Sequence, residues 1–186
     1  MKHRNGYLLL ESVVSLSAIL ILISILYYSL FFSYNIKSKL EDKVELQQQA
    51  NEMVKYVEDV IGNSKGIMSI SAKYPNYESE DILINTTSIK CKYKDGMNDK
   101  DVKNKEISLK KNSNKLFINT LNSMGNSEQG GYEIGDYIDN MYISIYEQGK
   151  FIKIKLELSK NDEKFQTEFK VNIRNFEGED DIWRQY

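Results

Sequence analysis

The sequence predicts an α+β protein in which one long N-terminal helix covers a single antiparallel sheet. Three observations predict this class. An apolar run without glycine or proline occupies residues 7–32, an amphipathic pattern with helical spacing continues to Gly62, and residues from Ile67 onward alternate with a period of two. A helix that is apolar on all sides suits a membrane, whereas three- and four-residue spacing indicates one covered helix face and alternation indicates half-buried strands.

Composition limits the chemistry to be expected. A length of 186 residues allows one globular domain and an attached segment, and the formal net charge of −2 gives no reason to expect nucleic acid as a partner of the head. The chain has one histidine, His3, and one cysteine, Cys91. We therefore expect no internal disulfide, no cysteine metal cluster and no cofactor. If an N-terminal leader that contains His3 is removed, the mature chain has no histidine and a histidine-based active site is excluded as well. Cys91 is either a small packed side chain or a thiol that pairs between chains.

The first predicted element is a membrane anchor. Residues 7–32 are 26 in number and carry one charge, that of Glu11. As a helix they measure about 39 Å, which exceeds the roughly 30 Å of a bilayer core. The run is too long for a signal peptide and no small-residue cleavage site follows it, so we interpret it as an anchor that stays. Lys2 and Arg4 precede the run and Lys37, Lys39 and Lys43 follow it, so charge counting leaves the orientation open.

Glu11 is the unusual residue of this anchor. An ionised carboxylate inside a spanning helix costs about 3 kcal/mol, and such residues are functional candidates. Glu11 lies about 6 Å along the axis from Tyr7, which lowers the cost without removing it. Two simpler interpretations stay open, namely that Glu11 reaches the lipid headgroups or that it remains protonated.

The residues around Glu11 carry a resemblance. The string K-H-R-N-G-Y-L-L-L-E-S, residues 2–12, resembles the leader and cleavage motif of type IV prepilins and pseudopilins. The resemblance implies a leader, residues 1–6, that is cut after Gly6, a mature N-terminus at Tyr7 that is N-methylated, and an assembly role for Glu11. Tyr7 and Leu8 depart from the usual Phe and Thr.

The same resemblance implies a pilin-like fold, partners and a location. The partners are a prepilin peptidase, other pilins or pseudopilins, the pilus assembly machinery and membrane lipid. The expected location is the cytoplasmic membrane, with one span and an exported head, and then a cell-surface filament. The absence of Gly and Pro from residues 7–32 favours a minor pilin or pseudopilin. K-V-N-I-R-N, residues 170–175, is similar to the last strand of the J-type pseudopilins and W-type minor pilins.

The helix is expected to continue through residues 33–62. Its apolar stripe is interrupted at one position and ends before a cluster of small residues that starts at Gly62. The stripe consists of Ile36, Leu40, Val44, Gln47, Ala50, Val54, Val57 and Ile61. The alternative is that the anchor ends near residue 32 and a separate coiled-coil linker follows.

Residues 63–176 are expected to form the β-rich head. Short strands are predicted at 82–84 and 89–93, and a hairpin is predicted with arms around Ile107 and Leu116 and a turn at 112–114. Three longer strands follow, around 141–145, 152–158 and 165–173, with turns at Gly149 and at 161–162. Each strand has one apolar face, so one side of the sheet is covered, and the amphipathic half of the helix is the natural cover.

Three other segments have sequence patterns that resemble known functional or structural motifs only in part. Residues 95–101 alternate oxygen ligands but lack the glycine and glutamate spacing of a calcium loop, and residues 125–135 are read as a loop without a nucleotide-binding pattern. Residues 177–186 form an acidic tail that is either solvated or anchored through Trp183 to the head or to a neighbouring subunit.

The main functional prediction is a minor pilin or pseudopilin subunit without enzymatic activity. It would serve pilus biogenesis, adhesion or motility, competence or secretion. The alternative is an uncleaved, single-pass, membrane-tethered binding or sensor domain. An anchored enzyme would need paired carboxylates, and no pair stands out among the 27 acidic residues.

Overall fold

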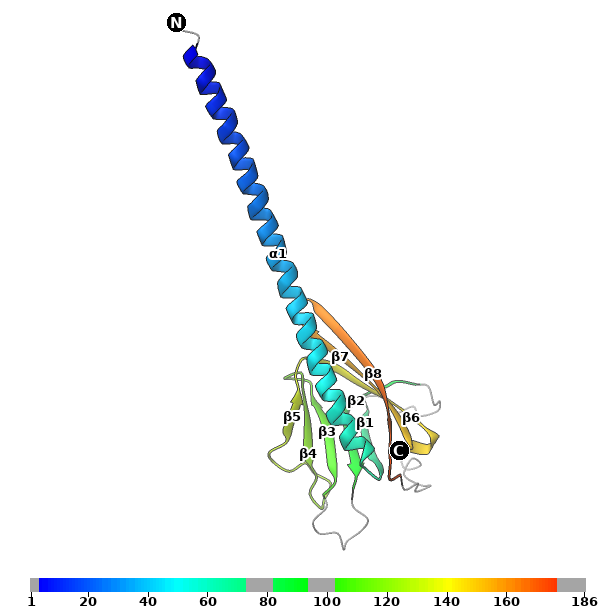
Figure 1. Cartoon of the computed structure of the whole chain (residues 1–186). Coiled ribbons are helices and arrows are strands. Elements are labelled where there is room, and N and C mark those ends of the chain that lie inside the picture. Colours follow the sequence, from blue (N-terminus) through cyan, green and yellow to red (C-terminus); the bar gives the residue numbers. More distant parts are fainter. Residues whose placement is uncertain (1–3, 73–81, 94–102, 177–186) are drawn as a thin grey trace. The chain divides into compact units, whose positions relative to one another are not determined.

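The computed structural model describes residues 4–72, 82–93 and 103–176, with the side chains of residues 4–6 excepted. The calcium-like loop at 95–101 and the acidic tail at 177–186 lie outside the described residues. The chain divides into two compact units, Met1–Glu41 and Asp42–Tyr186. Helix α1, Arg4–Gly62, begins in the first unit and ends in the second (Figure 1). Its continuity removes the alternative of a separate linker, and its end at Gly62 is as predicted.

The second unit contains an antiparallel sheet covered by the end of α1. The described residues form eight strands, and the path through the sheet is β5-β4-β3-β2-β6-β7-β8, with β1 paired to β2. The strands are β1 Gly66–Ala72, β2 Ile84–Lys92, β3 Lys105–Lys110, β4 Lys115–Thr120, β5 Tyr132–Gly135, β6 Ile138–Tyr146, β7 Phe151–Lys160 and β8 Glu163–Asn172. A short 3-10 turn, η1, Glu147–Gly149, joins β6 to β7. The α+β arrangement predicted from the sequence is therefore confirmed.

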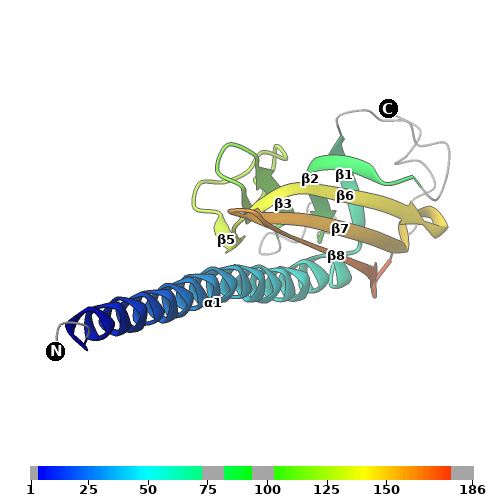
Figure 2. The same ribbon diagram turned by 90° about the horizontal axis from the view of Figure 1, so that it is seen from above.

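Strand β2 connects the two parts of the sheet. Its residues 88–91 pair with β3, its residues 84–86 pair with β6, and β1 pairs along 86–92. Beyond β6, the long hairpin of β7 and β8 pairs residue by residue over ten positions without a bulge. Figure 2 shows β6, β7 and β8 as long adjacent ribbons above the second half of α1. Asn161 begins the tight turn of this hairpin with φ at 52°, a conformation that asparagine tolerates well.

The core lies between the sheet and one face of α1. The helix contributes residues at alternating steps of four and three, Leu46, Ala50, Met53, Val57 and Val60, each 3% exposed or less. The sheet contributes side chains of its central strands that point toward the helix and are fully buried. They include Ile89, Cys91, Ile107, Met141, Ile143, Ile152, Ile154 and Leu156. A period of 3.5 residues keeps one face of a helix against one surface, so this pattern places α1 on the sheet.

The C-terminal end of α1 is fastened to the head by its own carbonyl groups. The last four carbonyls of a helix have no partner within it. Here Asn63 N–H donates to the Asp59 carbonyl at 3.2 Å, and Tyr93 Oη donates to the Val60 carbonyl. The Ile61 carbonyl accepts from Ser64 N–H and Oγ, at 3.1 and 2.6 Å. Arg174 N–H, beyond β8, donates to the Gly62 carbonyl at 3.0 Å. Each terminal carbonyl therefore has a donor, two of them from distant parts of the chain.

Some sequence predictions need correction. The predicted strands at 82–84 and 89–93 belong to one strand, β2, Ile84–Lys92. Its side chains alternate between buried and half-buried except at Ser88 and Ile89, which are adjacent and both buried. That pair breaks the strict alternation on which the division was based. Residues 132–135 belong to a predicted loop, but they form the short strand β5, which pairs with β4. The hairpin of β3 and β4 and the three strands β6, β7 and β8 are confirmed.

The predicted helical stripe also needs correction. Ile36, Leu40 and Val44 are 43%, 58% and 52% exposed, so they do not belong to the core. Of the predicted stripe, Ala50, Val57 and Ile61 are buried, whereas Gln47 is exposed. The buried face runs through Leu46 and Met53 instead, which removes Gln47 from the core. Two overlapping apolar patterns occur in this helix, and only contact with the sheet selects between them.

Candidate functional site: the exposed apolar helix of residues 7–32

The first candidate is the apolar segment of α1, because its side chains have no protein partner. Every large apolar residue between Tyr7 and Phe32 is between 55% and 72% exposed. These side chains occur on all sides of the helix, so no single partner surface could cover them. Among the described residues this is one helix long and apolar enough to cross a membrane, and none of its most apolar 18-residue window is buried. Burial as the core helix of a globular domain is therefore excluded.

The serines of this segment are compatible with an apolar environment. The hydroxyls of Ser12, Ser17 and Ser24 each donate to a backbone carbonyl three or four residues earlier, at 2.8 Å. In lipid an unsatisfied polar group costs several kcal/mol, and this back-bonding supplies the missing acceptor within the helix. The segment can therefore carry serines without needing a second protein surface.

The predicted site residues lie together in the first turns of α1. Gly6 and Tyr7 are within the helix, and Tyr7 is 72% exposed. Glu11 follows Tyr7 by four residues, so the two lie on one side of the helix. Its side chain is exposed, and within the described part of the chain its carboxylate has no hydrogen-bond or ion-pair partner. A carboxylate in this setting lacks the compensation that membrane carboxylates require.

Two aromatic residues that the sequence analysis does not single out lie where a membrane span that begins at Tyr7 would end. Tyr27 and Tyr28 are 72% and 71% exposed. They follow Tyr7 by 20 and 21 residues, which corresponds to about 30 Å of helix, the thickness of a bilayer core. Tyrosine is enriched at both membrane interfaces. The spacing between these tyrosines is the sequence signal that could have located the boundary.

Where α1 reaches the head, a charged cluster holds it. Lys160, at the end of β7, lies 2.9 Å from Asp42 and 2.6 Å from Glu45, and Asn161 donates to Asp42 at 2.8 Å. Hydrogen bonds from Asn161 and Lys160 lower the pKa of Asp42, and the hydrogen bond from Lys160 lowers that of Glu45. The hydrogen bonds to Glu45 and Asp42 raise the pKa of Lys160. Both carboxylates on α1 are paired with the ammonium group of Lys160 on β7, so the cluster joins the helix to the sheet.

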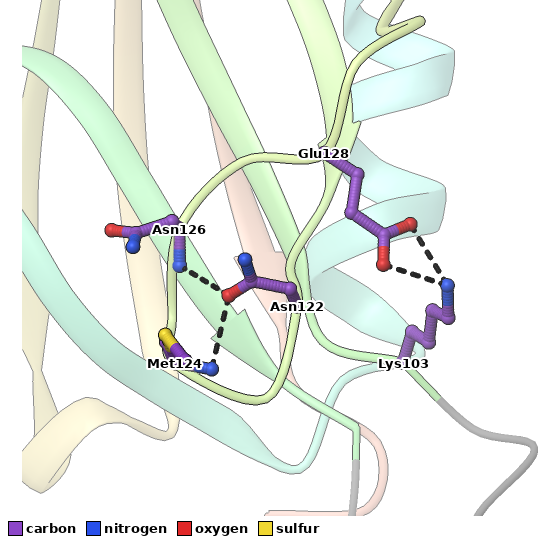
Figure 3. A network of polar contacts seen from close by, with 5 residues as sticks. All are labelled: Lys103, Asn122, Met124, Asn126 and Glu128. Atoms are coloured by element: carbon purple, nitrogen blue, oxygen red, sulfur yellow. Dashed lines mark hydrogen bonds and ion pairs between the residues drawn. The ribbon is translucent and has the colours of Figure 1, made fainter.

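A second polar network connects the loop between β4 and β5 to Glu106 of β3. Glu106 is 7% exposed, and burial alone would raise its pKa, but hydrogen bonds from Ser127, Ser88 and Asn119 hold the pKa below its usual value. Figure 3 shows the loop itself, in which Asn122 Oδ1 accepts from Met124 N–H and Asn126 N–H, both at 3.0 Å. Lys103 and Glu128 pair beside it at 2.7 Å. These bonds shape the loop.

Neither polar network forms a metal or thiol site. In the parts of the chain that the structure describes, no three His, Cys, Asp or Glu side chains are grouped as metal ligands. Cys91 is fully buried, and burial raises the pKa of its thiol to about 12, so its packed interpretation is confirmed and it is not available to a second chain.

Comparison with protein-family models, curated proteins and solved structures gave no match to this chain.

Proposed function

We propose that this chain is a minor pilin or pseudopilin subunit. A prepilin peptidase cuts it between Gly6 and Tyr7 and methylates the new N-terminus. The mature protein, which begins at Tyr7, is held in the cytoplasmic membrane by residues 7–32 with its head exported. It then joins other pilins or pseudopilins in a type IV pilus-like filament that serves adhesion, motility, competence or secretion.

The observation that supports this proposal most is the isolated carboxylate of Glu11. It is the single charge among 26 apolar and small polar residues, and it has no partner in the described chain. Cleavage before Tyr7 would create a second isolated charge, an ammonium group, one helical turn away. Both charges are costly alone in an apolar environment, and each compensates the other when two subunits lie at the correct axial stagger. Glu11 then sets the register of assembly.

The cleavage step is tested by the intact mass and N-terminal sequence of the full chain purified from membranes, with and without a co-expressed prepilin peptidase. We expect a chain that begins at Tyr7, heavier by one methyl group, only when the peptidase is present. Gly6→Val, which places a bulky side chain at the cleavage position, should keep Met1. A wild-type chain that still begins at Met1 beside a peptidase that cuts another prepilin would replace this proposal with the uncleaved, tethered domain.

The register step is tested separately with Glu11→Ala. This variant should be cut normally but should enter filaments at least about tenfold less often, because the ammonium group of its neighbour loses its partner. Ser15→Ala, one turn further along the same exposed helix, is the matched control and should assemble as wild type. Assembly is measured as the fraction of processed chain in sheared or sedimented filaments. Equal incorporation of both variants would rule out the role of Glu11.

A further inference from the structure

Three residues of complementary chemistry form one row across strands β2, β3 and β4. Lys90 of β2 lies opposite Glu106 of β3, and Glu106 lies opposite Asn119 of β4. Directly paired residues of antiparallel strands lie on the same face of a sheet. The row therefore contains an amine, a carboxylate and a carboxamide, with the carboxylate in the middle.

The adjacent row of the same strands contains three isoleucines. Ile89, Ile107 and Ile118 are paired in the same way, one residue further along each strand. The first two are fully buried, and Ile118 packs against the core. Successive residues of a strand point to opposite faces, so the polar row lies on the face opposite to these isoleucines. Its polar residues are not needed to fill the core.

The members of the polar row interact with one another. Asn119 Nδ2 donates to Glu106 Oε2 at 3.3 Å. Burial would raise the pKa of Glu106, but three hydrogen bonds and, as a smaller contribution, the charge of Lys90 lower it. The carboxylate thus contacts the amide nitrogen on one side and is close enough to the amine on the other side to feel its charge.

The loop between β4 and β5, residues 121–131, covers the amine and the carboxylate. The Gly125 carbonyl accepts a hydrogen bond from Lys90 Nζ at 2.8 Å, and Ser127 Oγ donates to Glu106. Glu106 is 7% exposed, and Lys90 is half-buried. This part of the row is therefore shielded from bulk water.

The same loop fixes the carboxamide of Asn119. Its Nδ2 donates to Ser108 Oγ at 2.8 Å as well as to Glu106. Its Oδ1 lies against Gly131, where a Cβ atom would stand 1.9 Å away, so this position accepts only glycine. Figure 3 shows the hydrogen bonds by which Asn122 shapes the start of the loop. The amide is held in one orientation beside the carboxylate.

These three groups are the reactants of an amide exchange. An unprotonated lysine amine is a nucleophile, the carboxamide carbon is an electrophile, and a carboxylate between them can carry the proton that has to move. Shielding from water disfavours the charged forms of both Lys90 and Glu106, which assists proton transfer between them. The Cα atoms of Lys90 and Asn119 are two strand spacings, about 10 Å, apart. The flexible four-carbon stem of lysine and the asparagine side chain together can bridge this distance.

We propose that Lys90 and Asn119 form an intramolecular isopeptide bond with Glu106 as the proton carrier. Glu106 accepts a proton from the Lys90 ammonium group, and Nζ leaves the Gly125 carbonyl and attacks Cγ of Asn119. The Nζ–Cγ bond forms and the Cγ–Nδ2 bond breaks. Nδ2 takes a second proton from Nζ, leaves as ammonia and removes the first proton from Glu106 as ammonium. Glu106 ends as a carboxylate, and the step consumes no other reactant.

The bond would tie β2 to β4 across β3. A covalent link between residues 90 and 119 restricts the unfolded chain as a disulfide does, and it is not broken by reduction. The single cysteine of this chain cannot supply an internal disulfide. The inference is independent of cleavage and filament assembly, because it depends only on the head.

The mass of the protein tests the proposal directly. The full chain is purified from membranes in detergent, denatured and measured by mass spectrometry. We expect it to be lighter by one ammonia molecule than the mass calculated for the N-terminus that is found, so leader cleavage does not affect the result. Digestion with trypsin should release a branched peptide that joins the segments around Lys90 and Asn119, because trypsin does not cut after an acylated lysine.

Three variants assign the roles. Lys90→Arg keeps the positive charge but lacks a nucleophilic amine, so it should have the full calculated mass. Glu106→Gln should yield at least about tenfold less branched peptide, because the proton carrier is lost. Lys103→Arg is the matched control, since Lys103 pairs with Glu128 beside the same loop, and it should lose ammonia as wild type does. Thermal unfolding verifies that each head is folded.

Four outcomes would count against the proposal. A folded wild-type head with the full calculated mass would overturn it. Loss of ammonia without the branched peptide would assign the reaction to succinimide formation at an asparagine and would also overturn it. A branched peptide found only in covalent dimers would exclude an intramolecular bond. Equal amounts of branched peptide in wild type and Glu106→Gln would overturn the role of Glu106.

Discussion

Helix α1 is one continuous helix with two different environments. Between Tyr7 and Phe32 its large apolar side chains are exposed on every side, whereas from Leu46 onward one face is fully buried and the opposite face is polar. The backbone is helical in both parts, so secondary structure does not distinguish them. The arrangement of apolar residues around the axis does, because an all-round pattern suits lipid and a one-sided pattern suits a sheet.

The difference also appears in how charge is handled. In the head-packed part, Asp42 and Glu45 share Lys160, and the helix ends with every terminal carbonyl satisfied. In the apolar part, Glu11 has no partner within the described residues. The head-packed part is complete as a folded structure, whereas the apolar part leaves its large side chains exposed and its one carboxylate without a partner among the described residues. Under the proposed function, another subunit supplies that partner.

The largest effect should come from truncating a side chain on the buried face. Met53→Ala removes a fully buried side chain between α1 and β5, and should lower the free energy of unfolding of the head by about 2–5 kcal/mol. Leu22→Ala, at a position that is 61% exposed, should leave the head unchanged. Both are measured by thermal unfolding of the full chain in detergent. Equal losses would contradict the division of α1 into two environments.

A substitution at Gly135 tests whether β5 contacts Met53 of α1. A methyl group at this position of β5 would collide with the Met53 side chain, so Gly135→Ala should destabilise the wild type by about 1–3 kcal/mol. In the Met53→Ala background the added methyl group occupies vacated space, and its cost should be smaller. Additive effects in this double-mutant cycle would show that β5 and α1 are not in contact.

A smaller effect, dependent on pH, should come from the cluster that holds α1 where it enters the head. The pKa of Asp42 lies below its ordinary value of 3.8, so its ionised form stabilises the folded state. That stabilisation is complete above the ordinary value and is lost as pH falls through the lower, folded-state pKa. Asp42→Asn should therefore unfold at a lower temperature than wild type at pH 7, and the difference should shrink below about pH 3.8.

Glu41→Gln is the control for the Asp42 experiment. Glu41 pairs with Lys37 at 3.6 Å, but both side chains are about two-thirds exposed or more, so the pair contributes little. Its unfolding temperature should follow that of wild type at every pH. A constant difference between Asp42→Asn and wild type down to pH 2 would contradict the assigned role of the charge.

Much of the fold could be predicted because it follows from local patterns. The apolar run, the end of α1 at Gly62 and the hairpin of β7 and β8 with its turn at Asn161 are each encoded within a few adjacent residues. Strand β5 was missed because it has four residues, lies beside glycines and is defined by its pairing with β4. That pairing is a tertiary contact, which local patterns do not encode.

The candidate site divides in the same way. Gly6, Tyr7 and Glu11 are predicted as site residues because the contiguous residues 2–12 resemble a prepilin leader motif, and their roles stay predictions. The partnership of Asp42 and Glu45 with Lys160 could not be found, since the residues are separated by more than a hundred positions.

The smallest effect should come from Gln47→Leu. The apolar pattern through Val44 and Val54 makes Gln47 look like an interruption of a core stripe, which leucine would repair. Gln47 is exposed, however, while Leu46 and Ala50 face the sheet. Leucine at residue 47 would remain in solvent, so the free energy of unfolding should change by less than about 0.5 kcal/mol. A gain of more than about 1 kcal/mol, measured by denaturant unfolding, would mean that the helix packs on the face through Val44 and Val54.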